Sequence, residues 1–272
     1  MDFDYSKTLW GRGTASLSMG SPTSIRLREC LRALRGLPDN ASVLEVGCGA
    51  GQFIRALQQL RPGWQCHGCD ISAPALTAAR WYNDGVSYQL ANDEKLPYNS
   101  EFFDAVVVFD VLEHVDNPAA FLAEIRRVLK PGGILYCFVP CEGDSLSFWH
   151  WLDMVGLKKN LTRRFAGHIQ YFSRAAVNNL CSEAGYAVMS RRYSEHVLGQ
   201  LLGIAVFMLM ARSARALNQT QLNNEEFFQQ LPVGPGGIGL LGRRMVNALV
   251  SLESFLLCRV PSPNLHIVVK KT

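Results

Sequence analysis

Residues 43–51 read Val43-Leu44-Glu45-Val46-Gly47-Cys48-Gly49-Ala50-Gly51, an apolar segment that leads into a turn with a glycine at every second position. Such a stretch is typical of a buried strand that delivers the chain to a tight turn and then to a helix. Glycine lets the backbone approach a ligand without a Cβ clash, and the amide groups of the following helix then face that ligand. The stretch therefore predicts a nucleotide-type cofactor site.

Asp70 is the second feature of this site, because it ends the next apolar segment, 19 residues after Gly51. An acid at this point is placed to accept hydrogen bonds from two ribose hydroxyls. The dinucleotide fingerprint G-x-G-x-x-G requires glycine at position 52, but the chain has Gln52 there, and its third glycine comes one residue earlier. The pattern E-x-G-x-G-x-G thus favours a cofactor other than a dinucleotide.

Four further motifs follow in order along the chain, at residues 92–97, 103–107, 111–115 and 127–133. Together with the glycine turn they resemble the class I S-adenosylmethionine-dependent methyltransferases, and the resemblance covers roughly residues 40–190. It implies an α/β fold with a doubly wound, mostly parallel seven-stranded sheet, the Rossmann-like methyltransferase fold. It also implies S-adenosyl-L-methionine as the cofactor.

The resemblance carries roles over to individual residues. The turn around the methionine part of the cofactor would be shaped by Glu45, Gly47, Gly49 and Gly51. The ribose would be held by Asp70 and Ile71, and the adenine would be bordered by Asn92 and Asp93. Either Phe109 or Asp110, at the end of the fourth strand, should flank the methyl group. The commoner pattern has aspartate at the position of Asn92, whose amide oxygen still accepts a hydrogen bond but brings no charge.

Two histidines are the candidate catalytic residues. His168 lies in a loop after Gly167 that we expect over the mouth of the site, and its ordinary pKa suits proton removal near neutrality. His114 follows Glu113 at the strand end nearest the methyl group, where it either touches substrate or hydrogen-bonds a helix terminus. A purely structural role is the alternative for both.

No metal site is predicted. Cys66 and Cys69 have the spacing of a zinc half-site, but they lie in an expected strand and no second pair matches them. A structural role is therefore expected for these two thiols.

The core is expected to alternate strands and helices, which indicates a parallel sheet covered on both faces. Strands are expected at 43–47, 65–69, 86–90, 104–109 and 134–139, and helices at 22–36, 51–60, 74–81, 118–129 and 174–184. The resemblance adds a closing antiparallel hairpin, here 187–193 with 265–271. The expected organisation is an N-terminal lid and helix (1–36), the cofactor-binding core (37–195), a helical insertion (196–263) and the last strand (264–272). The lid residues would be Tyr5, Trp10, Gly11 and Arg12.

The insertion holds an apolar run at 197–211, shorter than the roughly 20 residues that span a bilayer as a helix, and an amphipathic pattern at 240–258. Residues 191–272 carry nine basic and four acidic side chains, a net charge of +5. Two interpretations stay open. The helices lie on an anionic membrane surface or receive an amphiphilic substrate, or they pack on each other or across a homodimer axis.

The composition, with 48% hydrophobic and 18% charged residues, excludes a disordered chain. The opening residues 1–5 lack the apolar core of a secretory signal, and the eight cysteines lie mostly in apolar patterns, so we expect a cytoplasmic protein, with membrane association under the first interpretation of the insertion. The segment 147–154 is rich in large apolar side chains and lies where an acceptor pocket is expected.

The expected function is transfer of a methyl group to O, N or C of a small, lipophilic or lipid-linked acceptor. The alternative is a cofactor-binding interaction protein that has kept the fold without turnover. A nucleic-acid substrate is not expected, since no Asn-Pro-Pro-Tyr-like motif follows the fourth strand and no dense basic face with stacking aromatics is present.

Overall fold

A computed structural model describes residues 9–92, 95–156, 161–216 and 238–272 of the chain. Its strands are β1 (Ser42–Val46), β2 (Gln65–Asp70), β3 (Ser87–Leu90), β4 (Phe103–Phe109), β5 (Leu129–Pro140), β6 (Tyr186–Ser194) and β7 (Asn264–Lys271). Its helices are α1 (Ser24–Ala33), α2 (Gln52–Leu60), α3 (Ala73–Arg80), the 3-10 turn η2 (Leu112–His114), α4 (Pro118–Val128), α5 (Phe148–Met154), α6 (Leu161–Phe165), α7 (Arg174–Glu183), α8 (Val197–Ala216) and α10 (Ile238–Leu256).

The strands form one seven-stranded sheet in the order β3-β2-β1-β4-β5-β7-β6. Strands β1 to β5 pair in parallel, and β7 runs antiparallel between β5 and β6. The chain order reverses between β1 and β4, and in such sheets the ligand crevice lies beyond the carboxyl ends of the strands at this reversal. The expected doubly wound sheet with a helical insertion before its last strand is confirmed.

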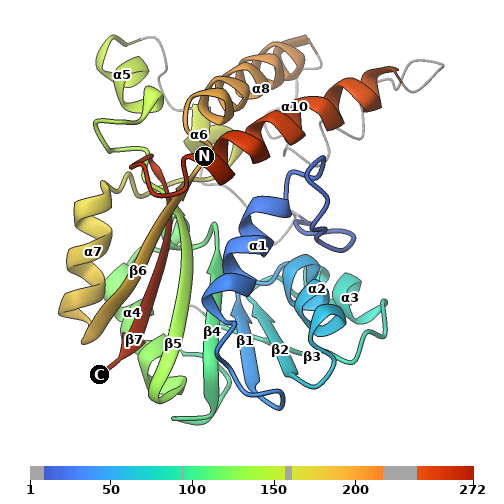
Figure 1. Cartoon of the computed structure of the whole chain (residues 1–272), viewed down its shortest axis with the longest axis vertical. Coiled ribbons are helices and arrows are strands. Elements are labelled where there is room, and N and C mark those ends of the chain that lie inside the picture. The colour runs from blue at the N-terminus through green and yellow to red at the C-terminus, as the bar shows by residue number, and fades with distance from the viewer. Residues whose placement is uncertain (1–8, 93–94, 157–160, 217–237) are drawn as a thin grey trace.

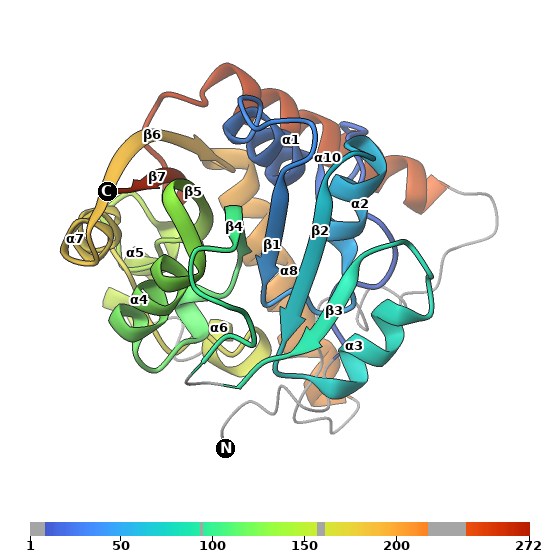
Figure 2. The same ribbon diagram turned by 90° about the horizontal axis from the view of Figure 1, so that it is seen from below.

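Helices cover both faces of the sheet (Figure 2). Along β1 the side chains alternate, so that Val43 joins the core beneath α1, α2 and α3, whereas Leu44 joins the core beneath α4 and α7. All five residues of β1 are buried because both of its faces are covered. This is why the strand reads as a continuous apolar run that ends at the glycine turn.

The insertion forms two long helices, α8 and α10, which cross above the end of the sheet where β6 stops (Figure 1). Helix α10 is joined to α1 by a hydrogen bond between the hydroxyls of Ser24 and Ser251, 3.1 Å apart. Among the helices of the described residues, none has the length and apolar character that crossing a membrane requires. The segment between α8 and α10 lies outside the described residues.

Three details differ from the sequence predictions. Strand β5 begins at Leu129 rather than at residue 134, because the backbone after α4 resumes pairing with β4 at Phe103 before the register shifts. Helix α1 is shorter than expected, and α5 and α6 were not predicted. The expected structural role of Cys66 and Cys69 agrees with their burial on β2, which raises the pKa of the Cys66 thiol to about 12 and leaves it unreactive.

Candidate functional site

The glycine turn follows β1 as expected, and Gly47, Gly49 and Gly51 all have positive φ angles. At Gly49, where φ is +52°, a Cβ atom would stand 2.7 Å from the carbonyl oxygen of Trp10. That oxygen accepts a hydrogen bond from the backbone amide of Ala50 at 2.7 Å. The turn therefore needs glycine for its own conformation and for the close approach of the segment that begins at residue 9.

Glu45 supports this turn from within the core. Its side chain is buried, and its Oε2 atom accepts a hydrogen bond from the backbone amide of Ile54 at 2.7 Å. Burial raises the pKa of the Glu45 carboxyl, while the bond from Ile54 acts in the opposite direction. The carboxylate thus ties β1 to the first turn of α2, which agrees with a role in shaping the turn.

Asp70, at the end of β2, connects the glycine turn after β1 with the start of the segment that leads into α3. Its Oδ2 atom accepts a hydrogen bond from the amide of Gly49 at 2.7 Å, and its Oδ1 atom accepts one from the amide of Ser72 at 2.8 Å. Burial raises the pKa of this carboxyl, and the backbone amides lower it. The neighbouring Ile71 is half exposed at the surface.

A hollow of about 520 Å³ lies next to Asp70 and is lined by residues 90–92 and 95–99. It begins at Leu90, the register partner of Asp70 on β3. Asn92, the expected adenine contact, lies on its wall, and its Oδ1 atom accepts a hydrogen bond from the amide of Lys95 at 2.6 Å. Asp93, the other expected adenine contact, lies outside the described residues.

The N-terminal segment lies over the glycine turn. Besides the contact of Trp10, the amide of Ala15 donates to the carbonyl of Gln52 at 2.9 Å. Arg55 fastens the segment, because its guanidinium donates to the carbonyl of Gly13 and forms a 2.9 Å ion pair with Asp84. Gly11 and Arg12 belong to this segment, whereas Tyr5 lies outside the described residues.

Phe109 and Asp110, the two candidates at the end of β4 for a contact with the methyl group, differ in how their side chains are packed. The Phe109 ring stacks on Phe53 with centroids 4.1 Å apart and packs in the core. Asp110 has a left-handed backbone with a φ of +52°, and its carboxylate pairs with Arg26 of α1 at 3.1 Å. Of the two candidates, Asp110 has the more exposed side chain, at 40% against 6% for Phe109.

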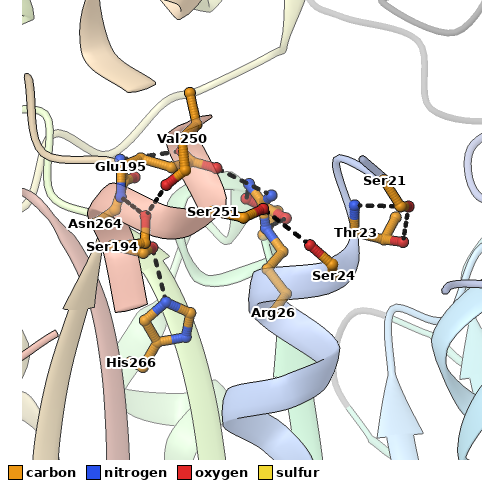
Figure 3. A network of polar contacts seen from close by, with 12 residues as sticks. Ser21, Thr23, Ser24, Arg26, Ser194, Glu195, Val250, Ser251, Asn264 and His266 are labelled. Atoms are coloured by element: carbon orange, nitrogen blue, oxygen red, sulfur yellow. Dashed lines mark hydrogen bonds and ion pairs between the residues drawn. The ribbon is translucent and has the colours of Figure 1, made fainter. Parts of the chain in front are cut away.

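Arg26 connects this edge to the insertion. Its guanidinium lies 3.5 Å from the carboxylate of Glu195, the residue after β6. The backbone amide of Glu195 donates to the Ser254 hydroxyl of α10 at 2.9 Å. Figure 3 shows this network between α1, the end of β6 and α10, including the 2.8 Å hydrogen bond between His266 and Ser194. Sequence reasoning missed Arg26 and Glu195, since nothing in either local pattern indicates a partner so distant in the chain.

His114 and His168 meet beside the site, with ring centroids 5.0 Å apart. The Nδ1 atom of His168 lies 3.0 Å from Glu142 Oε1, and the Nε2 atoms of both histidines lie 3.9 Å from Glu113 Oε1. His168 is only 9% exposed, so neither ring nitrogen points freely into solvent. Burial acts to lower the pKa of His168, but Glu142 and Glu113 act to raise it, and the role of His168 as a general base stays a prediction. Glu142 is a further residue that sequence reasoning missed.

A second cavity, of about 170 Å³, lies behind this cluster. Its lining residues are Glu142, Gly143, Trp149, His150, Asp153, Thr162, Arg163 and Tyr171. The expected acceptor segment, 147–154, therefore contributes three residues, Trp149, His150 and Asp153, to a cavity that shares Glu142 with the histidine cluster.

Similarity to known proteins identifies the family of this chain. A family profile described as a methyltransferase domain matches residues 24–191. The ubiquinone/menaquinone biosynthesis C-methyltransferase of Desulfotalea psychrophila is 30% identical over 194 residues, which are 67% of this chain and 72% of that protein. The probable chloroplastic tocopherol O-methyltransferase of Oryza sativa subsp. japonica is 32% identical over 139 residues, 47% of this chain and 38% of that protein.

The fold itself recurs in solved structures. A putative sarcosine dimethylglycine methyltransferase from Galdieria sulphuraria superposes with a TM-score of 0.59 at 14% identity, covering 92% of this chain and 87% of that one. The chain spans less than two thirds of several O-methyltransferases that it matches. From the profile match and the first relative, the chain belongs to the class I S-adenosylmethionine-dependent methyltransferases and is an enzyme of that family.

Proposed function

We propose that this enzyme binds S-adenosyl-L-methionine along the glycine turn and Asp70, and transfers its methyl group to O, N or C of a small lipophilic or lipid-linked acceptor. The 2.7 Å hydrogen bond from Gly49 to Asp70 carries the proposal. It brings a carboxylate suited to ribose hydroxyls against a turn too tight for any side chain. The hollow lined by residues 90–92 and 95–99 begins beside that carboxylate and is the proposed place of the adenine.

The residues present fit this cofactor. The Asp70 carboxylate accepts from the backbone amides of Gly49, Ser72 and Ile71, and its remaining acceptor capacity, out of about four sites, is proposed to serve the ribose. The hollow has the size of a small-molecule site. Glu45, Gly47 and Gly51 would shape the turn, Ile71 would flank the ribose, and Asn92 and Asp93 would border the adenine.

The cofactor supplies a methyl group on a sulfonium, which is already an activated electrophile. The protein is left to hold the acceptor in line and to exclude water, which is catalysis by proximity. Asp110, which pairs with Arg26, and the two histidines are proposed to border the acceptor. His114 and His168 are proposed as the groups that accept the proton that the acceptor loses. The segment from residue 9 to 15 is proposed as a lid over the cofactor.

The acceptor class rests on the surroundings of the second cavity and on the relatives. Trp149 and Tyr171 give that cavity aromatic walls. Relatives named for ubiquinone, menaquinone and tocopherol methylation support a lipophilic acceptor. To test the function, the purified enzyme is incubated with methyl-labelled S-adenosylmethionine and lipid or metabolite extracts, and labelled products are sought by mass spectrometry. The proposal would be refuted if the enzyme binds S-adenosylmethionine but no labelled product forms.

The insertion is proposed to lie on an anionic membrane surface, where such acceptors are found. Helices α8 and α10 expose large apolar side chains, including Leu201 and Met208 on α8 and Leu241, Met245 and Leu249 on α10. Exposed arginines stand next to them at positions 212, 243, 244 and 259. Apolar side chains flanked by basic ones are the pattern of a helix that lies in the headgroup region.

Sedimentation with liposomes tests this part. The protein should sediment with vesicles that contain phosphatidylserine, and less of it should do so as salt rises, because charges are screened beyond roughly 10 Å at 0.1 M. Replacing Arg243 and Arg244 with glutamate should weaken attachment without changing cofactor affinity. A protein that stays in the supernatant at low salt and runs as a compact homodimer would show that the two helices cover each other between subunits instead.

A further inference from the structure

Gly13, in the segment that lies over the glycine turn, is held on both sides of its peptide backbone by side chains of the core. Its amide donates to the Tyr82 hydroxyl at 3.1 Å, and its carbonyl oxygen accepts from the Arg55 guanidinium. The central carbon of that guanidinium lies 3.5 Å from the centre of the Tyr82 ring, which adds a cation–π contact. Arg55, Tyr82 and the ion-pair partner Asp84 are called the Gly13 clamp below.

Arg55 is the buried centre of this clamp. Its side chain is 1% exposed, and a buried guanidinium is costly unless an opposite charge and hydrogen bonds compensate its loss of water. Asp84 supplies the opposite charge, 2.9 Å from Nε, while the carbonyl oxygens of Gly13 and Ala50 accept from the two terminal nitrogens. Each nitrogen of the guanidinium therefore has an acceptor, and one of the three acceptors belongs to the N-terminal segment.

The other two acceptors of Arg55 are fixed independently of that segment. Ala50 belongs to the glycine turn, and Asp84 accepts from the Tyr88 hydroxyl at 2.8 Å and from the amide of Val86 at 3.1 Å. If residues 9–15 move away, Arg55 keeps its ion pair and loses only the Gly13 carbonyl, which water can replace. Opening of the segment therefore breaks hydrogen bonds but leaves no buried charge unpaired. The Gly13 clamp is thus a contact that can break and form again.

We propose that the Gly13 clamp holds residues 9–15 closed over S-adenosylmethionine, with Arg55 and Tyr82 as positioning residues that set how long the cofactor stays bound. This role rests on the proposed function, which places the cofactor beneath the segment. A methyltransferase must release its spent cofactor in every cycle, so a segment over the glycine turn has to open and close. Both side chains act through Gly13. Loss of the clamp should therefore speed release of the cofactor more than it changes association.

Two conservative variants weaken the clamp at different depths. Tyr82→Phe removes the hydroxyl that accepts from Gly13 and keeps the ring beside Arg55, and because Tyr82 is 46% exposed the fold should stay intact. Arg55→Lys keeps a positive charge beside Asp84, but a single ammonium nitrogen cannot replace a planar fork that serves three acceptors. Cofactor release should become about 2- to 10-fold faster in Tyr82→Phe and about 10- to 100-fold faster in Arg55→Lys.

Release is measured without any methyl acceptor. The full-length enzyme is loaded with methyl-tritiated S-adenosylmethionine and mixed with excess unlabelled S-adenosylhomocysteine, and the label that stays bound is followed on filters. Tyr186→Phe and Arg80→Lys are the matched controls. The Tyr186 hydroxyl donates to the carbonyl of Leu122 at 3.1 Å, and Arg80 donates to the carbonyl of Tyr88 at 2.8 Å, so neither bond involves the N-terminal segment. Both controls should release the cofactor at the rate of the parent.

Trypsin gives a second measurement, which needs no cofactor. Arg12 is exposed and directly precedes Gly13 in the segment. Cleavage after Arg12 requires the segment to leave its place, so the rate at which residues 1–12 are lost reports the open population. Tyr82→Phe and Arg55→Lys should be cleaved faster than the parent and the two controls. Bound S-adenosylmethionine should slow cleavage of the parent more than that of the clamp variants.

The outcomes separate the clamp from the proposed function. If the parent binds S-adenosylmethionine and folded Tyr82→Phe and Arg55→Lys variants release it at the parental rate, the role of the clamp is refuted and the proposed function stands. If Arg55→Lys does not fold, Tyr82→Phe alone decides in the same way. If the parent does not bind S-adenosylmethionine, the proposed function and the role in cofactor retention both fail, and the trypsin rates still show whether Arg55 and Tyr82 hold the segment.

Discussion

Replacing Asp70 with alanine examines the link between β2 and the glycine turn. The carboxylate holds the amides of Gly49 and Ser72 at 2.7 and 2.8 Å and is proposed to accept from the ribose. Hydrogen bonds to a charged group contribute about 1.5–3 kcal/mol, so the variant should bind S-adenosylmethionine roughly 10- to 150-fold more weakly. Titration calorimetry measures this affinity directly, and circular dichroism with thermal unfolding measures what happens to the fold.

Asp104 offers the matched control, because it too holds a backbone amide and a second donor. Its carboxylate accepts from the amide of Ser42 and from the Lys130 ammonium, both at 2.8 Å. It lies near the start of β4, at the opposite end of the parallel strands from Asp70. Asp104→Ala should lower the melting temperature and leave cofactor affinity unchanged. If Asp70→Ala behaves in the same way as Asp104→Ala, Asp70 is a structural acid and the assignment of the cofactor site is wrong.

Three more outcomes are expected. Gly49→Val should abolish cofactor binding and displace the N-terminal segment, because its side chain would collide with the carbonyl of Trp10; calorimetry that shows parental affinity would contradict this. His168→Ala should lower kcat by about 10²–10⁴, the range for a group that deals with the acceptor proton, with cofactor affinity unchanged; parental turnover between pH 6 and 9 would remove His168 from the active site. Burial acts to raise the pKa of Asp144, but hydrogen bonds from Arg174 and from backbone amides lower this pKa overall. The ionised Asp144 carboxylate therefore stabilises the fold above the unfolded pKa of about 3.9, and this stabilisation is lost as pH falls through the folded pKa. Asp144→Asn should therefore cost about 1–3 kcal/mol of unfolding free energy near neutrality, and the difference from the parent in urea unfolding should shrink below about pH 4; a difference independent of pH would contradict the argument.

The sheet and the glycine turn were predictable because their signals are local. A strand covered on both faces must be apolar throughout, as β1 is, and the turn after it must contain glycine. The alternation of β4 even held a signal that could have placed Phe109. Ala105, Val107 and Phe109 share one face of the strand, and the first two lie in the core beneath α1 to α3, so the third must lie there too.

The polar contacts of the site were not predictable from the sequence. Arg26 pairs with Asp110, and Glu142 orients His168, through side chains that come from separate elements. No periodicity encodes which rotamers meet across such distances. The position of Asp110 after a strand and of His168 after a glycine was visible, but the partner that sets the chemistry of each was not.

The position of β7 has a consequence for the order in which the molecule assembles. This strand lies between β5 and β6, although it comes after the whole insertion in the chain. Until residues 264–271 have been synthesised, β5 and β6 each keep an unpaired edge, and such edges readily pair with other chains. The sheet is therefore completed by a contact of long sequence separation, which is a slow step in folding. During synthesis, the nascent protein should depend on chaperones until its final strand emerges from the ribosome.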